Sequence, residues 1–173
     1  MPALLFFFLM PTGIALLLAL RSSGRKRWLA WGNFALLALP VLIADVGGML
    51  LSANNLAWRS CVKLPCGFAF VAGLLLLLVR AGAFLWKEID FWKPAAQTLG
   101  QILIMLTVGF LCLVIGWYGV LFSAIWAGED RVVERDGRTC VAEHVWMDDD
   151  VYAYYDGPWG TLVRGKNMLN MER

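Results

Sequence analysis

The fold is decided by the stretch PAAQTLGQILIMLTVGFLCLVIGWYGVLFSAIWAG, residues 94–128, which has no charged side chain in 35 positions. As a continuous helix it would extend about 52 Å, well beyond the roughly 30 Å hydrocarbon core of a bilayer. Directly after Gly128 the sequence changes to EDRVVERDGRTC, a short segment rich in charged residues. The change at Gly128 therefore predicts a membrane domain, residues 1–128, followed by a water-facing tail, residues 129–173.

The composition of the whole chain also points to lipid. Hydrophobic residues make up 60% and charged residues only 16%, and the mean hydropathy is +0.66, which leaves too little polar surface to cover a soluble domain. The runs are solidly apolar and do not alternate over about ten residues as the strands of an outer-membrane barrel do. We therefore expect an α-helical integral membrane protein, a bundle of four transmembrane helices near residues 2–20, 28–51, 64–86 and 95–127.

The basic residues around the first apolar run predict whether it is cleaved and how it is oriented in the membrane. A cleaved signal peptide has its positive charge before the apolar stretch, whereas here Arg21, Arg25, Lys26 and Arg27 follow it, so the helix is expected to be retained. Lys and Arg in short loops stay on the cytoplasmic side during insertion. The chain is accordingly expected in the cell membrane as a multi-pass protein, with both termini outside the cytoplasm.

Two charged residues lie inside the predicted helices, Asp45 and Arg80. Such residues are expensive in lipid and often mark functional sites. Their positions along the two helices differ in depth by about 16 Å, so they are not expected to pair. Arg80 fits an anchor at the inner interface, because its long side chain reaches water. Asp45 has a short side chain and is expected to meet a polar group of the outer loop, or to be a proton or cation site.

Small residues at every fourth position allow helices to approach closely in lipid. The last helix has this spacing at Gly119, Ser123 and Ala127. The face that they form is expected to pack within the bundle or, alternatively, against a second copy or a partner protein.

The tail is expected to form a four-stranded antiparallel meander. Asp136-Gly137 between β-prone segments is a strong hairpin signal, and later turn residues separate two further strands. A sheet this small leaves one apolar face uncovered. Its aromatic residues either pack on the rest of the chain or form a binding surface, for which the candidates are Trp146, Tyr152, Tyr154, Tyr155 and Trp159.

The cysteines leave three arrangements open. Cys61 and Cys66 lie near the predicted outer face and Cys140 lies in the tail, so Cys61 pairs with Cys66, or with Cys140, or none of them is oxidised. No Cys-x-x-Cys motif is present. The acidic run Asp148–Asp150 lacks the spacing of a calcium loop, and the single histidine, His144, forms no zinc set. We therefore expect neither a metal nor a cofactor.

Two classes of function follow from these patterns. The preferred one is a small membrane-anchored accessory protein that presents a β platform to a protein partner, as an assembly subunit, an inhibitor or an immunity-type protein does. The alternative is a small oligomeric transporter or channel subunit built around Asp45. An enzyme is not expected, because no paired acid and base or nucleophile is visible. Nucleic acid is not expected as a partner either, since the tail has ten acidic and six basic residues.

Overall fold

The computed structural model describes residues 2–54, 56–89, 93–135, 138–144, 151–154 and 163–165, and side chains for 9–24, 26–54, 56–89 and 93–128 of these. The chain divides into two compact units. The first unit comprises Met1–Leu39 and Phe68–Val120, and the second comprises Pro40–Gly67 and Leu121–Arg173. The boundaries between the units fall inside three helices. Each of these three helices therefore contributes residues to both units.

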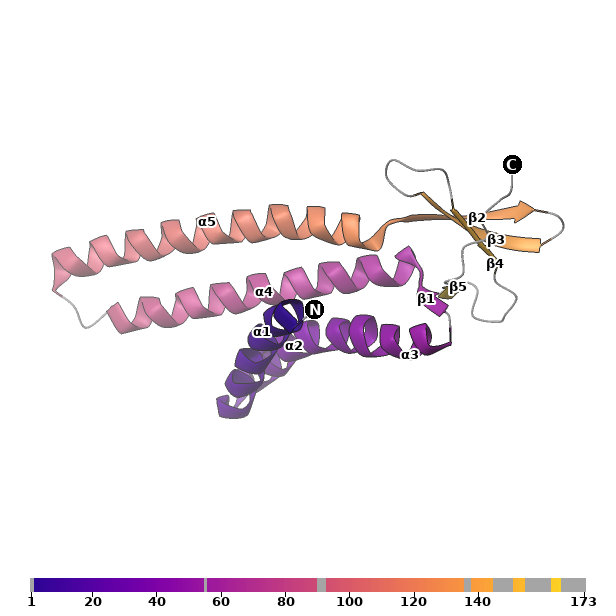
Figure 1. Ribbon diagram of the computed structural model, residues 1–173. Coiled ribbons are helices and arrows are strands. Elements are labelled where there is room, and N and C mark those ends of the chain that lie inside the picture. Colours follow the sequence, from indigo (N-terminus) through magenta and orange to yellow (C-terminus); the bar gives the residue numbers. More distant parts are fainter. Residues whose placement is uncertain are drawn as a thin grey trace. The chain divides into compact units, whose positions relative to one another are not determined.

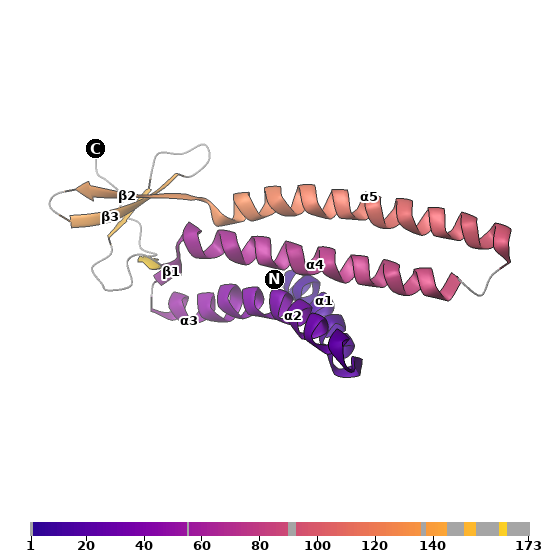
Figure 2. The ribbon, with the colours of Figure 1, turned by 180° about the vertical axis from the view of Figure 1, so that it is seen from behind.

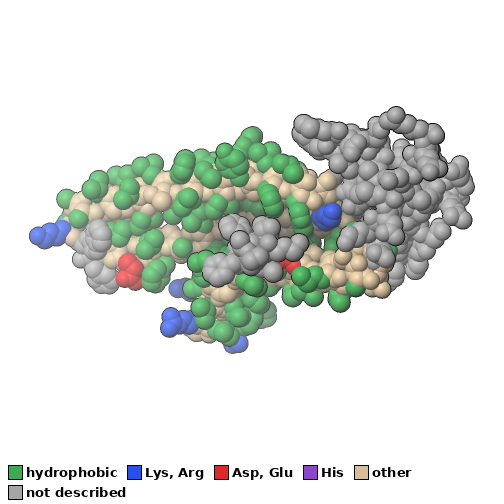
Figure 3. Space-filling model, in the orientation of Figure 1, with side chains coloured by type: hydrophobic (Ala, Val, Ile, Leu, Met, Phe, Trp, Pro, Cys, Tyr) green, Lys and Arg blue, Asp and Glu red, His purple; other side chains and the backbone are tan. Residues whose placement is uncertain are grey.

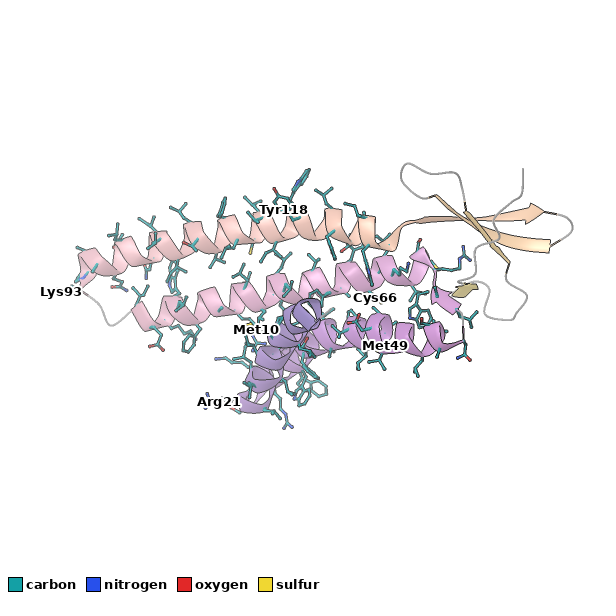
Figure 4. All side chains as sticks on the ribbon, viewed as in Figure 1. Met10, Arg21, Met49, Cys66, Lys93 and Tyr118 are labelled. Carbon is teal, nitrogen blue, oxygen red and sulfur yellow. The ribbon has the colours of Figure 1, made fainter. Side chains whose placement is uncertain are left out.

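The protein is helical and has three helices that are long and apolar enough to cross a membrane (Figure 1). They are Lys26–Ala53, Ser60–Glu88 and Pro94–Ala127, of 28, 29 and 34 residues. Hydrophobic side chains cover them in the space-filling view (Figure 3). Met10, Met49 and Tyr118 are each more than half exposed and extend away from their helices (Figure 4). Apolar side chains on the outside are typical of a protein surrounded by lipid.

Three of the four predicted spans correspond to these long helices, and the fourth, near residues 2–20, stays a prediction. The elements are α1 (Pro2–Arg21), α2 (Arg25–Val41), the π-helix η1 (Leu42–Gly47), α3 (Gly48–Ala53), α4 (Ser60–Glu88) and α5 (Pro94–Ala127). The single helix predicted near 28–51 is therefore divided into α2, η1 and α3. Helix α4 begins four residues before the predicted start, because the Arg59 carbonyl accepts hydrogen bonds from the amides of Val62 and Lys63.

Helices α4 and α5 lie side by side in the first unit, as Figures 1 and 2 both show. A Cβ added at Gly82 would lie 2.8 Å from Val108, and one added at Gly119 would lie 2.7 Å from Val71. The two contacts are eleven residues apart on both helices: from Val71 to Gly82 on α4, and from Val108 to Gly119 on α5. The two helices are therefore antiparallel and have the same register at both contacts. Glycine is needed at these points because only it lets the valine side chains approach the backbone.

Helix α2 also packs against α4 within the first unit. A Cβ added at Gly73 would lie 2.8 Å from the Leu37 side chain and 3.3 Å from the Leu36 backbone, and Leu37 is fully buried. Asn33, one turn before Leu37, is equally buried, and neither of its side-chain polar atoms has a hydrogen-bond partner among the residues that the structure describes. An unsatisfied buried amide costs about 1–3 kcal/mol, so this core contains a local polar defect.

The second unit contains two small sheets. Strand β1 (Leu56–Trp58) pairs antiparallel with β5 (Val163–Gly165), with Ala57 opposite Arg164. Strands β2 (Glu129–Arg135), β3 (Arg138–His144) and β4 (Val151–Tyr154) form an antiparallel sheet in the order β2-β3-β4. The expected turn residues Asp136 and Gly137 lie outside the described residues. The pairing of β5 with β1 was not expected from the sequence, and the single four-stranded meander stays a prediction.

The α4–α5 contact gives a direct test of this packing. Replacing Gly119 with Ala places a methyl group 2.7 Å from Cγ2 of Val71, a side chain with little rotamer freedom, so we expect a loss of about 1–3 kcal/mol in unfolding free energy. Gly116→Ala on the same helix is the matched control, because nothing lies within 4 Å of its added Cβ. It should be neutral or stabilising by up to about 1 kcal/mol. Equal stability of both variants in a detergent unfolding assay would contradict the close contact.

Candidate functional site

The second apolar span contains an interruption of regular helix at η1. Pro40 has no N–H, so the Leu36 carbonyl loses the partner that an α-helix would give it, and Gly47-Gly48 lowers the helix propensity further. The six residues Leu42–Gly47 between these points form a π-helix. Single π-helical turns inside α-helices are rare and are often found at functional sites. Asp45, the charged residue singled out by sequence, lies within this turn.

Trp58 covers η1 from the connection that follows α3. Its indole Nε1 donates a hydrogen bond to the Ile43 carbonyl at 2.8 Å. A Cβ added at Gly47 would lie 3.0 Å from Cζ2 of this ring, whereas one added at Gly48 would lie 3.8 Å from the ring. The missing side chain of Gly47 thus makes room for the indole, which fixes β1 against η1.

Asp45 is partly exposed, and its carboxylate has no hydrogen bond or ion pair with any residue that the structure describes. The expected partner was a polar group of the outer loop, which contains Asn54 and Asn55. The Asn54 side chain instead donates to the Leu50 carbonyl of its own helix, at 3.1 Å, and Asn55 lies outside the described residues. Among the described residues, Trp58 ties the outer connection to this helix, and the Asn54 amide does not meet the carboxylate.

Trp58 is therefore the site residue that sequence reasoning missed. A tryptophan near the end of a membrane span fits an aromatic belt in lipid. Because that explanation is sufficient, the sequence gives no separate reason to expect a specific hydrogen bond. One feature of the sequence could have indicated a contact here, namely Pro40 and Gly47-Gly48 in the same span. Together they interrupt regular helix, so backbone groups of the span need hydrogen-bond partners from outside that helix.

Arg80 lies on α4 in the first unit, eight residues before the helix ends at Glu88. It is partly buried and has no ion pair within the described part of the chain. Its role as an anchor at the interface stays a prediction.

The small-residue face of α5 contacts α4 in both units. Gly119 meets Val71 in the first unit. In the second, Ser123 is 2% exposed and its Oγ lies 2.6 Å from the Cβ position of Gly67. Ala127 is also 2% exposed, and its carbonyl accepts a hydrogen bond from the Ser60 hydroxyl at 2.9 Å. A second copy would have to displace α4 to use the same face.

The cysteines do not form the local disulfide. Cys66 is a buried free thiol (Figure 4), so the predicted Cys61–Cys66 alternative is wrong. Both residues lie on α4, and five residues of helical rise separate their Cα atoms by at least about 7.5 Å, too far for a disulfide. Cys140 lies on β3 opposite Val133 and Tyr154, and its pairing with Cys61 stays a prediction.

Two of the aromatic candidates in the tail fall on a described strand. The register places Tyr152 opposite Ala142 and Tyr154 opposite Cys140, and the alternation of a strand assigns these four positions to one face. Val151 and Ala153 belong to the other face. Trp146, Tyr155 and Trp159 lie outside the described residues.

Comparisons with known proteins place the chain in no group. No family model matches it, no curated protein matches it, and no solved structure matches it. In the part of the chain that the structure describes, no three His, Cys, Asp or Glu residues are grouped to hold a metal ion. The features that bear on function are therefore the geometry of η1, β1 and the tail.

The role of Trp58 can be measured with Trp58→Phe. Phenylalanine keeps an aromatic ring over Gly47 but has no donor for the Ile43 carbonyl, so we expect a loss of about 1 kcal/mol and amide hydrogen exchange in residues 42–48 that is about fivefold faster. Trp117→Phe on α5, where the side chain is 69% exposed, should leave exchange there unchanged. Identical exchange in the wild type and Trp58→Phe would show that the indole does not hold η1.

Proposed function

We propose that this protein is a multi-pass accessory protein of the cell membrane that presents its C-terminal tail to a protein partner outside the cytoplasm. The single observation that supports it most is the pairing of β5 with β1, which joins the end of the tail to the connection between two membrane spans. A tail joined in this way is positioned at the membrane surface and does not move as a free tether.

The rest of the second unit supports the same proposal. The Ser60 hydroxyl bonds the Ala127 carbonyl, so the start of α4 and the end of α5 lie at the same end of the two helices. Strand β1 precedes Ser60 and strand β2 follows Ala127, which brings the connection and the tail out of the membrane together. Trp58 then fixes β1 on η1. These contacts form the rigid base that a platform for recognition needs.

The proposed architecture has α1 as a fourth span and the tail as a β-meander. With 20 residues, α1 would extend about 30 Å, which is enough to cross the hydrocarbon core. The basic residues between α1 and α2 then assign that connection to the cytoplasm and both termini to the outside. We propose a non-enzymatic role, because the described side chains include no grouping of acid, base and nucleophile.

Recognition is assigned to the tyrosine face of the tail, Tyr152 and Tyr154. Tyrosine is enriched in interfaces because its ring gives a large contact area and its hydroxyl gives a hydrogen bond at a small entropic cost. The two positions lie on one face of β4, and the opposite positions Ala142 and Cys140 are small or apolar. Two tyrosines on one face of a strand suit the recognition of a protein partner.

The full-length protein with Tyr152→Ser and Tyr154→Ser tests this assignment. Crosslinking and affinity recovery from native membranes should yield a specific partner with the wild type and at least about tenfold less of it with this variant. Val151→Thr with Ala153→Ser, on the other face of the same strand, is the matched control and should retain the partner. Equal recovery with the wild type and both variants would refute the tyrosine face as the docking surface.

The π-helical position of Asp45 favours a second candidate, a small transporter or channel subunit. A carboxylate with no described partner in a membrane span is a group that a proton or cation could occupy. For this role we expect Asp45→Asn to lower ion flux into proteoliposomes at least about tenfold. Glu88→Gln, at the exposed end of α4, removes the same charge and should leave the flux unchanged. Wild-type flux no higher than that of empty liposomes would eliminate this candidate.

A further inference from the structure

The short turn between α1 and α2 concentrates positive charge. Only residues 22–24 separate the two helices, and Gly24 adopts a positive φ of 59° that makes so tight a turn possible. The Ser22 hydroxyl donates back to the Leu18 carbonyl of α1. Arg21 is the last residue of α1 (Figure 4), and the first three residues of α2 are also cations. We call this group the basic turn; its members are Arg21, Arg25, Lys26 and Arg27.

No acidic residue of the neighbouring sequence balances this charge. The first carboxylate in the chain is Asp45, and α2 has no acidic residue in its first turn. Among the described side chains, those of Arg21, Lys26 and Arg27 are exposed and have no ion-pair partner. Cations in the first turn also oppose the positive end of the helix dipole. The arrangement therefore disfavours the isolated helix, and a bound anion would stabilise it.

The apolar residues beside the basic turn indicate where this anion resides. Leu20 and Leu29 are each more than 60% exposed, and the Trp28 side chain is 84% exposed. The candidate membrane span begins at Lys26, so Trp28 lies in its first turn. Exposed tryptophan at the end of a span sits at the level of lipid headgroups, where the available anion is a phosphodiester.

We propose that the basic turn binds the phosphate of an anionic phospholipid headgroup. The guanidinium groups of Arg21 and Arg27 have the planar pair of donors that suits phosphate oxygens, and Lys26 adds charge. The exposed apolar side chains next to them contact the glycerol and acyl region. This assignment is independent of the role proposed for the tail, because it concerns the first unit alone.

The test uses the full-length protein in a neutral detergent, titrated with short-chain phosphatidylglycerol or phosphatidylcholine and followed by native mass spectrometry. Each Lys or Arg near an anionic lipid contributes about fivefold in affinity, so Arg21→Gln with Arg27→Gln should bind phosphatidylglycerol about 25-fold more weakly. Phosphatidylcholine binding should not change. Lys87→Gln with Lys93→Gln, exposed residues at the facing ends of α4 and α5, removes the same charge and should weaken binding less than about threefold.

Three results would overturn the proposal. Equal losses in the two double variants would indicate diffuse attraction to the whole charged surface. Displacement of the lipid by a tenfold excess of inorganic phosphate would indicate a site for soluble phosphate. The variant Arg21→Lys with Arg27→Lys retains the charge but loses the paired guanidinium donors, so we expect only a partial loss of affinity, up to about fivefold. This variant also serves if the glutamine variant does not fold. A loss of 25-fold in the lysine variant would therefore contradict headgroup binding.

Discussion

Every backbone N–H and C=O group that enters hydrocarbon must find a partner inside the protein, because no water is available there. This constraint explains why the apolar runs are helices and why the departures from regular helix are few. It also explains the positions of the glycines. Lipid provides little driving force for helix association, so α4 and α5 depend on close van der Waals contact, which Gly82 and Gly119 allow against Val108 and Val71.

The same constraint makes η1 the most informative departure. Pro40 removes one donor from the helix, and the π-helical turn that follows changes the pairing of the next carbonyls. One of these, the Ile43 carbonyl, receives the indole N–H of Trp58 from outside the helix. The connection after α3 is therefore fixed by a backbone group that regular helix would have used itself. In the second unit, an irregularity in a membrane span and the placement of β1 have a common physical cause.

Much of the helical fold could be predicted from the sequence, and the reasons are local. Length and apolar composition locate the spans, because a bilayer has a fixed thickness. The spacing of Gly119, Ser123 and Ala127 indicates a packing face, but spacing alone does not say which helix that face meets. The contacts with Val71 and Gly67 depend on the register of α4, which is a long-range property.

The prediction failed where several local signals had to be combined or where partners are distant in sequence. The Cys61–Cys66 bridge seemed possible while α4 was expected to begin at residue 64, and the earlier start at Ser60 places both cysteines on one helix. The pairing of β5 with β1 joins segments more than 100 residues apart. Turn residues predict only pairings between strands that are neighbours in the sequence. The hydrogen bond of Trp58 had no separate signal in the sequence, because a tryptophan at a span end fits both an aromatic belt and a specific hydrogen bond.

Two polar residues of the second span illustrate how differently a neutral and a charged group behave in this setting. Asn33 is completely buried and has no hydrogen-bond partner in the described part of the chain. Its neutral amide costs about 1–3 kcal/mol, which helix packing can offset. A carboxylate buried in the same way would cost far more, and it would take up a proton or draw in water or a cation. Asp45 is correspondingly only partly buried, and it lies where η1 departs from regular helix. The chain thus tolerates an unsatisfied neutral amide inside its packed core, but it keeps the one acidic residue of this span accessible. This arrangement is expected when the acidic residue interacts with a group outside its own helix.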